Sequence, residues 1–255
     1  MSSLGLEGSQ TTGARIVVVM PAYNAARTLR ETFARIPLVV SQVILVDDHS
    51  RDDTVAIASS LGLKVISHPH NVGYGGNQKT CYMEALREGA DVVVMLHPDG
   101  QYDPELIVDL VRPILQGSAD MVLGSRMLMP GGPRKAGMPM WKIISNRILT
   151  TIENLAMGTR FSECHTGYRA YSSNFLRRVP FLRNSNDFVF DTQIIAQAVA
   201  FRQRVEEIPA RTRYFSEASS INFSGSVRYG IKTLATMAHF LAWRLGLRRS
   251  RLFQR

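Results

Sequence analysis

Continuous apolar runs alternate with segments of helical periodicity through the first half of the chain. The runs "ARIVVVM", "SQVILV", "DVVVML" and "ADMVLG" contain no polar alternation, which predicts strands buried on both faces. Between them, segments such as "AARTLRETFARIP" and "PELIVDLVRPILQ" place apolar residues three or four apart, as amphipathic helices do. Strands that alternate with helices predict an α/β fold with a mostly parallel, doubly wound sheet and helices on both faces.

The second half of the chain is less regular. The segment "MPGGPRKAGMPMW" is rich in Gly, Pro and Met, which predicts a mobile loop. Helices are expected over "KIISNRILTTIENLAMG" and "DTQIIAQAVAFRQ", and a short strand or turn over "HTGYRAYS". The segment "VEEIPARTRYF" reads as a strand that Pro209 interrupts, so we expect it at an edge of the sheet.

Composition narrows the class of protein and of partner. The 255 residues are 45% hydrophobic and 20% charged, as in ordinary folded domains, and two cysteines make no disulfide framework. The formal net charge of +9 favours anionic partners, which include nucleic acid, anionic lipid and phosphorylated small molecules. We expect no nucleic-acid partner, because aromatic and basic residues are not interleaved on one strand or helix.

Three regions follow from these patterns. Residues 1–14 read as a flexible N-terminus without the features of a signal peptide, residues 15–225 as the α/β domain, and residues 226–255 as a basic amphipathic helix and tail. The tail contains no acid, and Trp243 and Phe253 are expected as interfacial anchors on an anionic membrane. The alternative is a helix packed on the domain or in a dimer contact.

The expected location follows from the same pattern. No stretch reaches the roughly 18 apolar residues of a membrane span, so we expect a cytoplasmic protein, or one bound peripherally at the cytoplasmic face of the membrane. The sequence leaves the oligomeric state open.

Polar side chains gather where the predicted strands end. Parallel sheets bind ligands beyond the carboxyl ends of their strands, so Asp47, Asp48, Asp99 and Arg126 are expected to share one crevice with the segment 21–24. Asp52 or Asp53 can cap the next helix, but Asp47 still lies within the strand. A carboxylate there accepts hydrogen bonds from a ribose or a base, which favours nucleotide binding.

Glycines before the third helix give a weaker signal. The segment "NVGYGGNQKT" contains neither GxGxxG after a strand nor a Walker sequence. It is either a tight loop before a helix or a place where the backbone approaches a nucleotide.

The segment "HPDGQYDPE" combines two patterns. His97, Asp99 and Gln101 alternate after a strand, and in extended backbone they face one side, which predicts a Mg²⁺ or Mn²⁺ site that holds a diphosphate. Asp103 and Pro104 are typical of a helix start. Among basic residues, Arg126 follows a strand. Arg134 and Lys135 lie in the predicted mobile loop, where they either belong to a lid over bound phosphates or are simply solvated.

These motifs, in order, resemble the inverting family-2 glycosyltransferases, and most of all the polyprenyl- or dolichyl-phosphate sugar transferases. The segments are "VVVMPAYNAARTL", "VILVDDHSRDDT", "HNVGYGGNQ", "VVMLHPDGQYDPELI", "MVLGSRM", "HTGYRAYS" and "VEEIPARTRY", within roughly residues 15–225. The resemblance implies a GT-A fold and transfer of a sugar from a UDP- or GDP-linked donor. It also implies roles: Pro21, Ala22 and Tyr23 line the nucleotide pocket, Asp48 meets the base or ribose, Asp99 and Gln101 bind the metal, and Arg126 lies near the phosphates or the acceptor.

Two positions depart from the family pattern. His97 stands where the family's Asp-x-Asp has its first acid, so either His97 is a ligand or metal dependence is weakened. Ala25 stands where many relatives carry Glu, which removes one nucleotide contact.

The acceptor decides whether the reaction needs a base. A sugar hydroxyl must lose a proton, whereas a lipid phosphate is already anionic. Asp191 is the candidate base by position, with a structural carboxylate at a helix start as the alternative. Arg126, Lys135 and Arg169 are candidates for an acceptor phosphate.

Two other classes are weighed against a transferase of this kind. A nucleotidyltransferase usually carries a loop rich in glycine and basic residues directly after its first strand. The segment "PAYNAARTL" is not such a loop. A nucleotide-binding protein without turnover is motivated by His97.

Overall fold

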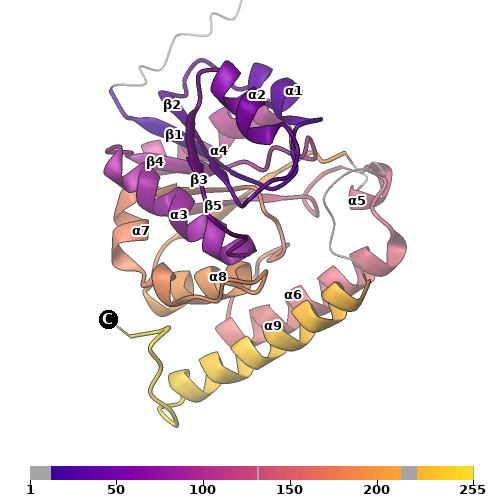
Figure 1. The fold of residues 1–255 in the computed structure, drawn as a ribbon. Helices are drawn as coiled ribbons and strands as arrows, with labels where there is room; N and C mark the ends of the chain where they lie inside the picture. The colour runs from indigo at the N-terminus through magenta and orange to yellow at the C-terminus, as the bar shows by residue number, and fades with distance from the viewer. Residues whose placement is uncertain (1–12, 131, 214–222, 255) are drawn as a thin grey trace, which may run out of the picture.

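The computed structural model describes residues 13–130, 132–213 and 223–254 (Figure 1). Its seven-stranded sheet has the order β3-β2-β1-β4-β6-β5-β7. The strands are β1 (Ile16–Ala22), β2 (Gln42–Asp47), β3 (Lys64–Ser67), β4 (Val92–Met95), β5 (Met121–Ser125), β6 (Arg169–Ser172) and β7 (Val205–Pro209). The α-helices are α1 (Leu29–Ala34), α2 (Thr54–Ser60), α3 (Tyr74–Arg87), α4 (Ile107–Leu115), α5 (Gly132–Lys135), α6 (Met140–Met157), α7 (Ser173–Arg178), α8 (Phe190–Ala200) and α9 (Phe223–Arg244).

The sheet is mostly parallel, as the sequence predicts, with one reversed strand. β1 pairs in parallel with β2 and β4, and β2 with β3. β6 runs antiparallel to both β4 and β5, so two reversals give β5 the direction of β4. The carboxyl ends of β1, β2, β4 and β5 therefore lie at one edge of the sheet.

Helices cover both faces of the sheet, which explains the continuous apolar runs. In β1, Val17 and Val19 belong to one core cluster, shared with residues of α3 and α8. Val18 and Met20 belong to a second cluster on the opposite face, shared with residues of α1, α2 and α4. All seven residues of β1 are buried, so the predicted doubly wound sheet is confirmed.

Several local signals act as predicted. Asp52 Oδ1 accepts a hydrogen bond from the backbone N–H of Thr54, at the start of α2. Asp103 accepts one from Glu105, with Pro104 at the first position of a 3₁₀ turn that leads into α4. β7 ends at Pro209 and lies at an edge of the sheet, as expected.

The Gly- and Pro-rich segment, predicted to be a mobile loop, contains helical residues. Residues Gly132–Lys135 form the short helix α5, and α6 begins at Met140, two residues before the predicted start. Of the predicted N-terminal region 1–14, residues 1–12 lie outside the described residues. So does the end of the predicted domain, residues 214–222.

α6 and α9 lie side by side as the two longest helices of the described chain (Figure 1). The prediction that Phe253 is an interfacial anchor is wrong, because its side chain is buried in the core with ring centroids 5.2 Å from Phe240 and 5.4 Å from Trp243. Exposed apolar residues lie elsewhere: Ile144, Ile148 and Leu155 on α6, Val227, Ile231, Leu234 and Leu241 on α9, and Leu245 directly after α9. None of the described helices combines the length and apolar character that a membrane crossing requires.

Candidate active site

A cavity of about 1010 Å³ lies over the carboxyl edge of the sheet. Its lining comes from the ends of β1, β4 and β5, the start of α3 and α8, and the sides of α6 and α9 that face it. The sequence-predicted residues that line the cavity are Pro21, Ala22, Tyr23, Asp48, His97, Asp99, Gln101, Arg126 and Asp191. The structure thus brings together residues that are up to 170 positions apart in the chain, between Pro21 and Asp191.

Asp48 is fixed by the glycine-containing loop before α3. Its carboxylate accepts hydrogen bonds from the backbone N–H of Val72 (2.8 Å) and Gly73 (3.0 Å), and lies 3.0 Å from His68 Nδ1. Gly73 has φ 88°, and a Cβ there would lie 2.6 Å from the carbonyl oxygen of Asn186. The loop requires glycine at this position, and it holds the Asp48 carboxylate at the cavity.

Asp47 and Lys135 are not among the residues that line the cavity. Asp47 is buried, and its Oδ2 accepts a hydrogen bond from the N–H of Ser50 at 3.1 Å. Its Oδ1 is buried without a hydrogen-bond partner among the described residues. Arg134 and Lys135 are exposed on α5, so a role for them over bound phosphates stays a prediction.

The segment from His97 to Gln101 is a turn, so the prediction of extended backbone there is wrong. Asp99 Oδ1 accepts a hydrogen bond from the N–H of Gln101 at 3.0 Å, and Gly100 has φ 71°, which together reverse the chain. The three side chains nevertheless all line the cavity. Burial lowers the pKa of His97 and raises the pKa of Asp99.

The donor set at this turn fits a metal that is shared with a substrate. The described residues contain no group of three or more His, Cys, Asp or Glu side chains that would enclose an ion by itself. Mg²⁺ is commonly held by only one or two carboxylates together with substrate phosphates and water. The Oδ2 atom of Asp99 accepts no hydrogen bond from the described residues, which leaves this oxygen for such an ion.

Arg126 is held by a buried carboxylate that no sequence motif marks. Glu163 is fully buried and accepts hydrogen bonds from Arg126 N and Arg126 Nε, each at 2.8 Å, and from Asn146 Nδ2 at 2.8 Å. Burial alone would raise the pKa of Glu163, but the charge and hydrogen bonds of Arg126 outweigh it and lower that pKa. Arg126 therefore faces the cavity from a fixed position.

Asp191 lies in the first turn of α8, but it does not cap that helix. The N-cap residue is Val189, and the Asp191 carboxylate accepts hydrogen bonds from Tyr74 Oη (2.8 Å), Gln78 Nε2 (3.1 Å) and Arg169 (3.1 Å). Although burial disfavours the charge of Arg169, the Asp191 carboxylate beside it contributes to a raised pKa of Arg169. Arg169 itself does not line the cavity, whereas Asp191 does.

Some residues that line the cavity have no signal of their own in the sequence. Lys142 and Asn146 face it from α6, and Tyr229 faces it from α9. His165 also lines the cavity. Its motif, "HTGYRAYS", can be recognised in the sequence, but the sequence does not indicate that this side chain reaches the cavity.

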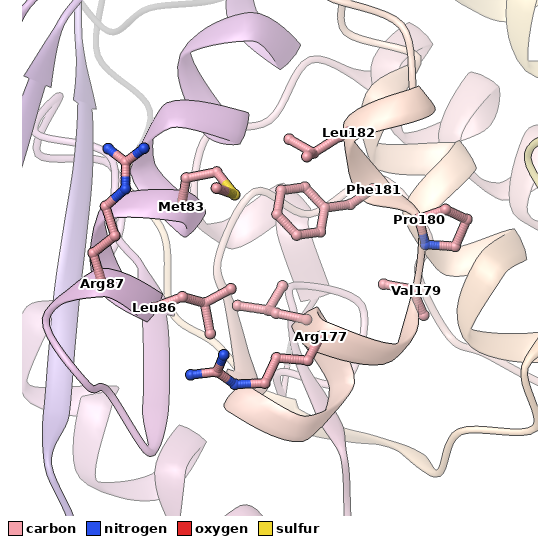
Figure 2. A pocket seen from close by; sticks show the side chains of 9 residues that line it. Met83, Leu86, Arg87, Arg177, Val179, Pro180, Phe181 and Leu182 are labelled. Carbon is pink, nitrogen blue, oxygen red and sulfur yellow. The ribbon is translucent and has the colours of Figure 1, made fainter. Parts of the chain in front are cut away.

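A second, smaller cavity of about 380 Å³ lies between α3 and the segment that follows α7 (Figure 2). Its lining is mainly apolar, with Arg87 and Arg177 at one side and Met83, Leu86 and Phe181 among the apolar residues. It has no acid in its lining and shares no residue with the larger cavity, so the candidate chemistry belongs to the larger one.

The fold is GT-A-like, and the cavity lies at the carboxyl edge of its sheet. Glucosyl-3-phosphoglycerate synthase from Mycobacterium tuberculosis, solved with Mg²⁺ and uridine diphosphate, has the same fold with a TM-score of 0.68 and 19% identity. The match covers 90% of this chain and 80% of that chain.

Residues 17–179 match the model of glycosyl transferase family 2, and this chain belongs to that family. It is 27% identical over 217 residues to a UDP-N-acetylglucosamine–dolichyl-phosphate N-acetylglucosaminyltransferase of Methanococcus voltae, covering 78% of this chain and 86% of that protein. It is also 27% identical over 203 residues to an undecaprenyl-phosphate mannosyltransferase of Micrococcus luteus, covering 76% and 82%. The resemblance to this family, and the prediction of a glycosyltransferase, are confirmed.

Proposed function

We propose that this glycosyltransferase moves a sugar, with inversion, from a nucleoside-diphosphate sugar to a polyprenyl-phosphate acceptor, in a reaction that depends on Mg²⁺ or Mn²⁺. The observation that carries the proposal is the convergence of Asp48, Asp99 and Arg126 on one large cavity at the carboxyl edge of the sheet. The relatives that act on dolichyl and undecaprenyl phosphate support this class of acceptor.

The donor side of the cavity has groups suited to a nucleotide. The segment Pro21–Tyr23 supplies an apolar and aromatic wall for a base, and Tyr23 is half exposed at its rim. Asp48 offers a carboxylate to a ribose hydroxyl or base N–H, and the loop of Val72 and Gly73 orients it. We assign UDP- or GDP-linked sugars to this side.

His97, Asp99 and Gln101 are the residues proposed to hold the divalent ion, together with the donor's diphosphate. The GT-A neighbour solved with Mg²⁺ and uridine diphosphate supports a metal of this kind. A bound ion would neutralise negative charge on the leaving diphosphate. Arg126 contributes positive charge from the chain itself, held in place by Glu163.

The proposed reaction is a direct displacement. A phosphate oxygen of the acceptor attacks the anomeric carbon and forms the new C–O bond. The bond from that carbon to the donor's diphosphate breaks, and the nucleoside diphosphate leaves with the bonding electrons. Because the acceptor phosphate is already ionised, no proton has to be removed and no base is required.

A hydroxyl acceptor is the second candidate, and Asp191 favours it. Its carboxylate lines the cavity and is oriented by Tyr74 and Arg169, as a positioned general base would be. An Asp191→Asn variant separates the two cases. It would abolish transfer to a hydroxyl, but transfer to a lipid phosphate would continue at a reduced rate.

For its location, we propose peripheral attachment to an anionic, cytoplasmic membrane surface through α9 and the basic tail. The exposed residues Val227, Ile231, Leu234 and Leu241 form one stripe at helical spacing on α9. The segment that follows α9 adds Arg248, Arg249 and Arg251. An apolar stripe with basic neighbours is typical of helices that lie on anionic bilayers.

The decisive test is transfer with a donor panel. Purified protein is incubated with UDP- and GDP-linked sugars and a polyprenyl phosphate, with Mg²⁺, with Mn²⁺, or with EDTA. We expect one donor to yield a glycolipid in the presence of metal, and Asp99→Asn to reduce that rate by about 100-fold or more, because a charged ligand is lost. A glycolipid yield that neither EDTA nor the Asp99→Asn substitution lowers would contradict the metal role. No turnover with any donor or acceptor would contradict the proposed function.

A further inference from the structure

The wall of the cavity formed by α6 and α9 has no role in the donor site described above. From α6, the lining residues Trp141, Lys142, Ser145, Asn146 and Leu149 recur at helical spacing, so one side of this helix faces the cavity. From α9, Ser226 and Tyr229 face the same cavity, one turn apart. This wall therefore combines polar and apolar groups that a second substrate can contact.

Lys142 is a half-buried cation on this wall without an acidic partner among the described residues. Burial, and then the positive charge of Arg126, lower its pKa. Its Nζ atom lies 5.4 Å from the centre of the Trp141 ring. Two cations that repel each other at one cavity favour an anion between them.

Tyr229 is tied to this wall by a buried pair of side chains. Its hydroxyl lies 2.7 Å from His165 Nδ1, and His165 Nε2 lies 3.0 Å from Glu153 Oε2, although that contact is not aligned as a hydrogen bond. Glu153 is fully buried on α6. A hydroxyl from α9 is thus held at the cavity by groups from α6 and from the loop before β6.

Apolar surface continues from this wall to the outside of the molecule. Trp141 is 41% exposed, and Ile144 and Ile148, which follow it on α6, are 52% and 55% exposed. On α9, Val227 and Ile231 are also exposed, but each is two positions from Tyr229 and therefore lies on the side of the helix away from the cavity. A cation inside the cavity next to an apolar path to the exterior suits a ligand with an anionic head and an apolar chain.

We propose that Lys142 and Tyr229 bind the phosphate of a lipid-phosphate acceptor, whose chain leaves the cavity along Trp141 and the exposed side chains of Ile144 and Ile148 on α6. This inference rests on the proposed function and assigns acceptor recognition to residues separate from the donor groups Asp48 and Asp99. His165 acts through Tyr229 as a positioning residue.

The test measures acceptor and donor recognition separately. Farnesyl phosphate serves as a short acceptor, and binding is measured by calorimetry alongside its KM in transfer. We expect Lys142→Gln to weaken farnesyl phosphate binding and raise its KM by about tenfold or more, because a charged contact is lost. Tyr229→Phe has a smaller effect in the same direction. Nucleoside diphosphate affinity stays within about twofold, since the donor groups are untouched.

Two further variants make the result specific. Lys142→Arg keeps the charge and restores most of the farnesyl phosphate affinity. Arg147→Gln removes a positive charge from the same helix at an exposed position that does not line the cavity, and acceptor binding stays unchanged. Farnesol, which lacks the phosphate, binds to the wild type far more weakly than farnesyl phosphate does. The affinity for farnesol is the same in the wild type and in Lys142→Gln.

The outcomes distinguish this inference from the proposed function. If wild-type protein makes glycolipid while Lys142→Gln keeps its farnesyl phosphate affinity, the subsite is wrong and the function stands. An equal loss of nucleoside diphosphate and farnesyl phosphate binding in Lys142→Gln also overturns it. If the wild type neither binds farnesyl phosphate nor transfers a sugar to any lipid phosphate, the proposed acceptor and the subsite both fail.

Discussion

At the scale of single residues, Glu163 and Arg126 form a buried ion pair at the cavity. Their attraction and hydrogen bonds offset part of the free-energy cost of removing the Glu163 carboxylate from water. Replacing Glu163 with Gln leaves Arg126 as a buried cation without its carboxylate. We expect the free energy of unfolding to fall by about 3–5 kcal/mol at pH 7, since breaking a buried pair leaves an uncompensated charge. Urea denaturation of the wild type and the variant measures this difference.

The same pair predicts a dependence on pH. The folded protein lowers the pKa of Glu163 below its ordinary value of 4.5, so its ionised form stabilises the fold above that pH. This contribution is lost as the pH falls through the lowered pKa. We therefore expect the gap in stability between wild type and Glu163→Gln to narrow at pH values well below 4.5. A gap that is constant between pH 7 and pH 3 would contradict the ion pair.

The contrast between Asp48 and Glu163 shows which site residues a sequence can reveal. Asp48 follows a recognisable buried strand, so its place at the carboxyl edge follows from the pattern. Glu163 lies between the predicted helix 142–158 and the segment "HTGYRAYS", outside both patterns, and its role depends on contacts with Arg126 and Asn146 that only the folded chain creates. Local pattern locates strand ends, but not the partners that tertiary packing brings to them.

At the scale of elements, α3 enters the site through a close approach to the loop before α8. A Cβ at Gly75 would lie 2.3 Å from the Ser185 carbonyl oxygen and 2.8 Å from Phe190 Cβ. We expect Gly75→Ala to lower the free energy of unfolding by about 1–3 kcal/mol, because neither backbone nor core side chain yields easily. Gly75→Ala should also reduce turnover, since α8 carries Asp191.

Gly230 in α9 is the matched control. A Cβ there meets only Leu149 Cδ1 at 3.8 Å, an ordinary contact. Gly230→Ala is expected to raise the free energy of unfolding by about 0.5–1 kcal/mol through helix propensity alone. Chemical denaturation of both variants checks the pair, and a Gly75→Ala variant at least as stable as the wild type would contradict the close approach at Gly75.

Elements were predictable where the period of the pattern is unambiguous. The strands β1, β2 and β4 are short apolar runs between helical segments, and each is present. The place of β6 between β4 and β5 was not predictable, because strand order is fixed by pairings between distant segments and not by local pattern. For the same reason, the side of α6 that faces the cavity could not be told from a side that faces the core.

At the scale of the whole molecule, positive charge and an exposed apolar surface occur together. The net charge is +9, and the exposed apolar residues of α6 and α9 lie on two helices that pack against each other. Exposed apolar surface of this extent marks an interaction site. The membrane placement proposed above accounts for both features, because anionic lipid attracts the charge and the bilayer interface accepts the apolar side chains.

This placement predicts binding to anionic vesicles, with variants that test the stripe directly. We expect cosedimentation with phosphatidylglycerol-containing vesicles, less with neutral phosphatidylcholine vesicles, and a decrease in high salt as charges are screened. The double variant Ile231→Asn/Leu241→Asn should reduce the bound fraction by about tenfold or more, since two apolar side chains no longer leave water. Leu38→Asn removes a fully exposed apolar residue far from both helices in sequence, and binding should be unchanged. If the double variant sediments like the wild type, then the stripe on α9 does not hold the protein at the membrane.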